Sequence, residues 1–73
     1  MPHVTVKMYP GCTQEQKNKL AQEITNAIMT ITQKPEDAIS IAIEEVKESE
    51  WMDKVYKTEI SPNMENLYKK PGY

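Results

Sequence analysis

Polar and apolar residues alternate in two stretches of the chain. The first stretch is HVTVKM (residues 3–8) and the second is ISIAIEEV (residues 39–46). A period of two places successive side chains on opposite faces, so the pattern predicts two β-strands that each bury one face. Tyr9, Pro10 and Gly11 end the first strand, because proline lacks a ladder donor and glycine favours turn geometry.

A helical pattern fills the interval between the two strands. Thr13 and Gln16 have the spacing of a capping box, in which each residue satisfies a free amide of the other. Pro35 disfavours a helical Lys34, so the helix is expected to end near Gln33. Apolar residues recur at helical spacing and predict one buried stripe: Leu20, Ile24, Ala27, Ile28 and Ile31.

The order strand, helix, strand predicts a βαβ unit of the α+β class. Such a crossover is right-handed in about 98% of cases and leaves the two strands parallel. A sheet of two parallel strands has unpaired backbone groups along both edges. We therefore expect a second subunit to pair one edge, giving a four-stranded sheet with helices on one face.

The last third of the chain predicts a helical tail of two short helices. Ser49 is expected to cap the first, and Ser61 with Pro62 to begin the second. Lys69 and Lys70 would then lie in its last turn, where positive charge suits the helix dipole. Because no linker or repeat divides the sequence, we expect one domain over residues 1–73.

The small size of the chain also favours association. A domain of 73 residues buries only about 60% of the surface that its unfolded chain exposes. Cys12 is the only cysteine, so an internal disulfide is impossible. Cys12 and His3, the only histidine, are together too few ligands for a zinc site. We therefore expect no metal, and a partner subunit as the source of additional stability.

The charged residues exclude several classes of partner. All nine basic residues are lysines, against eleven acidic residues, and the net charge is -2. The basic stripe expected of a nucleic-acid-binding protein is missing. No apolar run approaches the roughly 20 residues of a membrane span, and the N-terminal residues do not form a signal peptide. We expect a cytoplasmic protein that binds neither nucleic acid nor membrane.

Pro2 is the strongest candidate for chemistry. A small residue at position two permits removal of Met1, which would leave a free imino nitrogen. An α-amino group has a pKa of about 7.7 to 8.0, and an apolar environment lowers the pKa further because it disfavours the charged form. Such a nitrogen can act as a base near neutral pH, but only once Met1 is gone.

The complete pattern resembles the 4-oxalocrotonate tautomerase family. The resemblance covers essentially the whole chain and rests on Pro2 and on the stretches PGCTQEQKNKL and ISIAIEEVKESEW. It implies a tautomerase fold like that of macrophage migration inhibitory factor, and a cofactor-free isomerase that interconverts keto and enol groups. The ending SPNMENLYKKPGY is similar to a small bacterial branch that forms homodimers, and the tail lacks the glycine-bearing hairpin of hexameric relatives.

The resemblance also implies roles for individual residues. Pro2 takes the position of the family's general base and acid, and Trp51 that of an aromatic residue that walls the pocket. Two arginines that bind substrate carboxylates in well-known members are replaced by Cys12 and Ser40. Neither residue supplies a bidentate positive clamp, so the substrate is expected to be a monocarboxylate resembling an arylpyruvate.

The group that binds the single carboxylate stays open among backbone amides near Ile39 and Ser40, or Lys69 and Lys70. His3 is expected on the opposite strand face from Pro2, at an interface or the surface. Two further functions also stay open. One is a dimeric binding module without catalysis, which the missing arginines would suit. The other is a different reaction of the superfamily, namely hydration, dehalogenation or decarboxylation.

Overall fold

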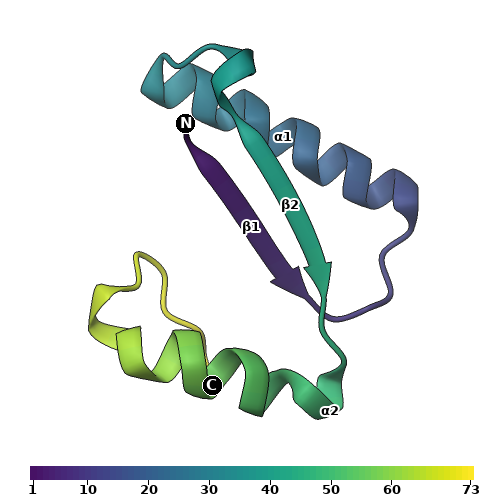
Figure 1. Ribbon diagram of the computed structural model, residues 1–73, viewed down its shortest axis with the longest axis vertical. Coiled ribbons are helices and arrows are strands. Elements are labelled where there is room, and N and C mark those ends of the chain that lie inside the picture. The colour runs from purple at the N-terminus through teal and green to yellow at the C-terminus, as the bar shows by residue number, and fades with distance from the viewer.

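The computed structural model describes residues 1–73 and contains the predicted βαβ unit (Figure 1). Strand β1 (His3–Met8) is followed by helix α1 (Gln14–Thr32), a 3-10 turn η1 (Glu36–Ala38) and strand β2 (Ser40–Glu45). The two strands are parallel, with six aligned pairs from His3 opposite Ser40 to Met8 opposite Glu45. The predicted strands, helix and parallel pairing are confirmed.

Local signals set both ends of α1. The Gln16 amide donates to the Thr13 hydroxyl at 3.1 Å, and the Thr13 amide donates to the Gln16 side-chain oxygen at 2.8 Å, which confirms the capping box. Gln33 ends the helix with a φ of 63°. Gly11 precedes the helix with a φ of 138°, a conformation that favours glycine.

Two predicted members of the apolar stripe are wrong. Ala27 is exposed, and the side chain of Ile31 is 79% exposed. For Ile31 the reason is length: α1 has 19 residues and extends about 28 Å, whereas each strand has six residues and extends about 20 Å. The last turn of the helix therefore runs past the sheet.

The two faces of the sheet have different neighbours. Lys17 of α1 pairs with Glu45 of β2 at 3.1 Å, so α1 lies on the face that Glu45 shares with Ile43 and Ile41. The opposite face presents His3, Thr5 and Lys7 from β1 beside Ser40, Ala42 and Glu44 from β2. Helix α1 leaves this second face uncovered.

The C-terminal segment is helical but differs from the prediction at both ends. Helix α2 (Glu48–Trp51) continues directly into a π-helix, η2 (Met52–Ile60), and a 3-10 helix, η3 (Ser61–Asn66). Ser49 lies inside α2 instead of capping it, and Lys47 takes the cap position without a side-chain bond. The helix predicted from Ser61 does begin there.

That last helix ends earlier than predicted. Asn63 has a non-helical φ of -114°, and Leu67 is extended, so the chain leaves the helical path after η3. Lys69 and Lys70 consequently lie in an irregular tail instead of a last helical turn. Tyr68, in the same irregular tail, is fully exposed.

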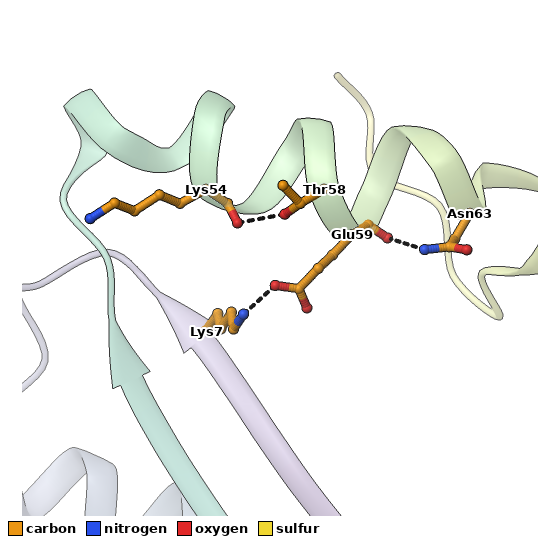
Figure 2. A network of polar contacts seen from close by, with 5 residues as sticks. All are labelled: Lys7, Lys54, Thr58, Glu59 and Asn63. Atoms are coloured by element: carbon orange, nitrogen blue, oxygen red, sulfur yellow. Dashed lines mark hydrogen bonds and ion pairs between the residues drawn. The ribbon is translucent and has the colours of Figure 1, made fainter.

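An ion pair connects the C-terminal segment to the sheet. Lys7 of β1 donates to the Glu59 carboxylate of η2, as Figure 2 shows, and this bond raises the pKa of Lys7. Asn63 and Thr58 donate to backbone oxygens of the turns before them, which supports the segment internally. The segment therefore lies beyond the ends of the strands, near the arrowheads in Figure 1.

The isolated chain has very little buried core. Val55, at 5% exposure, is its only fully buried residue. Separately, none of the helices combines the length and apolar character that a membrane crossing requires. Its accessible surface is 5806 Å², whereas a compact monomer of this mass exposes about 4,600 Å². Both strands of the two-stranded sheet are edge strands. The chain thus exposes surface that folded proteins usually cover.

Candidate active site

The first group of predicted site residues lies at the beginning of the two strands. The amide of Ser40 donates to the Pro2 carbonyl at 3.2 Å, which places Pro2 beside Ile39 and Ser40. The amino group of Met1 donates to the Ala38 carbonyl. Pro2 and Ile39 are half-buried, whereas Ser40 is exposed on the face that α1 does not cover.

Met1 decides whether this end of the sheet carries a basic nitrogen. While Met1 is attached, the Pro2 nitrogen belongs to a tertiary amide and has no useful basicity. Removal of Met1 converts it into a secondary amine on a rigid ring at the start of β1. The position of that amine is fixed because the ladder bond to Ser40 holds the Pro2 carbonyl.

The second group surrounds an apolar cavity at the other end of β1. The cavity has a volume of about 380 Å³ and is lined by Met8, Tyr9, Trp51 and Tyr73. None of these side chains carries a formal charge at neutral pH. The cavity therefore suits a flat apolar group, and aromatic walls of this kind are common in small-molecule sites.

The ladder explains why these residues meet. The Val46 amide donates to the Met8 carbonyl at 2.8 Å, so the chain enters α2 directly beside the end of β1. Tyr9 follows Met8, and its ring meets the Trp51 indole edge to face, with centroids 5.2 Å apart and planes at 90°. This geometry is favourable for aromatic rings because their faces are negative and their edges positive.

Tyr73 closes the group from the end of the tail. The indole N–H of Trp51 donates to the Tyr73 hydroxyl at 3.0 Å, and the rings of Tyr73 and Tyr56 lie 5.8 Å apart. Because an indole N–H can only donate, this bond fixes one orientation of the Trp51 ring. Tyr73 itself remains 61% exposed, so it forms the outer rim of the cavity.

Three predicted binding residues belong neither to the group around Pro2 nor to the cavity lining. Cys12 is a half-buried free cysteine in the turn after β1, at the Trp51 end of the sheet. Lys69 and Lys70 are exposed in the tail before Tyr73 and take part in no ion pair. No three His, Cys, Asp or Glu side chains are grouped so that they could hold a metal ion.

The predicted site residues therefore fall into two separate groups. Pro2, Ile39 and Ser40 lie at one end of the six-residue strand β1, and Trp51 lies beyond the other end, about 20 Å away. Figure 1 shows this separation, with the N terminus and the α2 helix at opposite ends of the strand. A single subunit does not bring the nitrogen and the indole together.

Sequence reasoning missed two aromatic residues of the cavity. Tyr9 was interpreted only as part of the turn that ends the strand, and Tyr73 was given no role. Tyr73 and Trp51 are 22 positions apart, so no periodic pattern links them. Tyr9 carried a weak signal, because it directly follows the last residue of β1, at the same sheet end from which the chain leaves β2.

Comparison with known proteins identifies the class to which this chain belongs. Residues 2–55 match the family model described as "Tautomerase enzyme", and the chain belongs to this tautomerase family. Membership supports an enzyme of the tautomerase type, an isomerase. The matched residues include Pro2, both strands, α1 and Trp51.

Individual relatives match over nearly their entire length. The chain is 39% identical to tautomerase PptA of Cronobacter sakazakii and 42% identical to tautomerase PptA of Klebsiella pneumoniae strain 342, covering 97% of each. Among solved structures, the chain resembles YwhB, a homologue of 4-oxalocrotonate tautomerase. The TM-score is 0.62 at 43% identity, over 63% of this chain and 75% of that one. The resemblance predicted from sequence is confirmed.

Tyr73 should control the environment of Trp51, the only tryptophan in the chain. We expect Tyr73→Ala to shift the fluorescence emission of Trp51 to longer wavelength, because the indole loses its partner and meets more water. Tyr73→Phe, which removes only the hydroxyl, should give a smaller shift. Tyr68→Phe is the matched control, since Tyr68 is fully exposed. An unchanged spectrum in Tyr73→Ala would contradict the role of the tail in the cavity.

Proposed function

We propose that the protein is a keto-enol tautomerase in which the Pro2 nitrogen is both general base and general acid. The proposal is supported above all by the position of Pro2, behind a removable methionine and at the start of β1, in a chain of the tautomerase family. We favour tautomerisation over the other reactions of the superfamily, because it needs only the one proton-transferring nitrogen that Pro2 can supply.

The reaction needs only one group that moves a proton. The neutral Pro2 amine takes the proton from the enol hydroxyl of a 2-hydroxy-2-alkenoic acid, and the oxygen lone pair forms the carbonyl double bond. The electrons of the carbon-carbon double bond then take a proton from the Pro2 ammonium at C3. The amine is regenerated, no electrons are gained or lost, and no cofactor is required. A positioned general acid or base of this kind typically increases the reaction rate by about 10² to 10⁴-fold.

The cavity favours a substrate with one carboxylate and an aryl or alkyl tail. Its lining is apolar, and the chain contains no arginine that could bind a second carboxylate. Trp51 is proposed to pack against the tail, as the family resemblance implies. Lys69 and Lys70 lie in the same C-terminal segment of the protein as Tyr73 and remain candidates for contact with the substrate carboxylate. Cys12 is a further candidate, because it lies at the Trp51 end of the sheet.

The active form is proposed to be a homodimer. Pro2 and Trp51 lie at opposite ends of β1, so a site that uses both requires Pro2 of one subunit and Trp51 of its partner. Edge pairing of two subunits would extend the sheet to four strands and reduce the excess exposed surface. If the strands of the two subunits run antiparallel across the dimer interface, the Pro2 end of each subunit lies near the Trp51 end of the other. Such a dimer would contain two equivalent sites.

Replacement of Pro2 tests the proposed base. Pro2→Ala, with Met1 still removed, should lower turnover by about 10²-fold or more, because no ring holds its primary amine in place. Pro62→Ala is the control, since Pro62 is exposed in the first turn of η3 and does not line the cavity. Mass spectrometry of the protein from cells should show that Met1 is absent. A protein that retains Met1 and still turns over substrate would contradict the proposal.

The substrate class is tested by comparing an aryl monoacid with a diacid. We expect kcat/KM for phenylenolpyruvate to exceed that for 2-hydroxymuconate by about tenfold or more, because a second carboxylate would lose hydration without gaining a positive partner. Trp51→Ala should reduce the advantage of the aryl substrate. A clear preference for the diacid would refute the substrate class while leaving Pro2 as the base.

A further inference from the structure

We infer that His3 and Ser40 together form the group that binds the anionic oxygen of the substrate, with His3 as a positioning residue for the Ser40 hydroxyl. This inference rests on the proposed function for the identity of the substrate. It assigns a role to His3, which the sequence alone placed only at an interface or the surface, and it singles out the Ser40 side chain.

The two residues are opposite each other in the parallel ladder. His3 Nδ1 lies 2.6 Å from Ser40 Oγ, and His3 Nε2 lies 3.2 Å from Thr5 Oγ1. All three side chains lie on the sheet face that α1 leaves uncovered. Ser40 also bonds Pro2 through its backbone amide, so the cluster begins one residue from the proposed base.

The direction of the hydrogen bonds follows from what an anion can accept. A carboxylate or enolate oxygen has no proton to give, so it must accept the Ser40 hydroxyl proton. Ser40 Oγ is then free to accept from His3 Nδ1–H, and His3 Nε2 becomes the acceptor for the Thr5 hydroxyl. The series of hydrogen bonds from Thr5 through His3 to Ser40 thus leaves the Ser40 hydroxyl proton free to bind an anion. Each bond in the series polarises the next.

The ammonium of Lys7, which shares this face, is not available for the same task. Lys7 lies four aligned pairs beyond His3 and Ser40, and its ammonium is held by Glu59. The missing arginine at position 40 therefore has a neutral replacement, in which a hydroxyl supplies the donor and an imidazole holds its orientation. A single well-placed donor can bind one carboxylate but not two, which agrees with a monoacid substrate.

Paired substitutions at His3 separate a directional role from simple packing. His3→Asn keeps an amide near the position of Nδ1, whereas His3→Gln moves the amide to the position of Nε2. We expect Ser40→Ala and His3→Gln to raise KM for phenylenolpyruvate about 10- to 100-fold, the effect of a hydrogen bond to a charged group, and His3→Asn to stay within about threefold of the wild type. Thr5→Val, of nearly equal shape, should give a smaller rise.

Binding without turnover separates this inference from the proposed function. In the Pro2→Ala protein, 3-phenylpropionate should shift the ¹⁵N resonances of His3 toward the Nδ1–H tautomer, and Ser40→Ala should weaken its binding about tenfold or more. The inference is overturned if the imidazole resonances do not respond, or if His3→Gln and His3→Asn behave alike. Loss of the proposed function would show instead as full turnover in Pro2→Ala, with the imidazole response intact.

Discussion

The parallel pairing of β1 with β2 is the interaction on which the rest of the structure depends. Six aligned residue pairs fix what lies at each end of the sheet. At the beginning, the pairing places Pro2 beside Ile39 and Ser40. At the other end, the bond from Val46 to Met8 directs the chain into α2 and brings Trp51 against Tyr9. A slip of one residue would turn every side chain to the opposite face and separate both groups.

The same pairing also explains why one copy of the chain buries little surface and keeps Pro2 apart from Trp51. Two strands bury too little surface for a stable core, and Val55 alone is fully enclosed. The proposed base, Pro2, and the aromatic cavity occupy opposite ends of a strand about 20 Å long. The proposed homodimer would remedy both deficits, because a second copy of the chain would cover exposed surface and supply the other half of the site. Stability and catalysis would then depend on the same contact.

The parts of the fold that local chemistry determines could be predicted from the sequence. Alternation gave the strands, and the Thr13–Gln16 pair gave the start of α1, because each signal acts within a few residues. Ser49 was wrongly expected to cap a helix, because Lys47 occupies that position once β2 ends. The contact of Tyr73 with Trp51 and the bond from His3 to Ser40 join distant parts of the chain, so only the folded structure reveals them.

Subunit complementation tests the central claim most directly. Pro2→Ala and Trp51→Ala chains are prepared separately, each with low activity, and are then mixed under conditions in which subunits exchange. If each site combines Pro2 of one subunit with Trp51 of its partner, one of the two sites in every mixed dimer is intact. Equal amounts of the two chains make about half of the dimers mixed, so activity should rise to about one quarter of the wild-type value. Mixed dimers that form, as shown by mass, without any gain in activity would contradict the account.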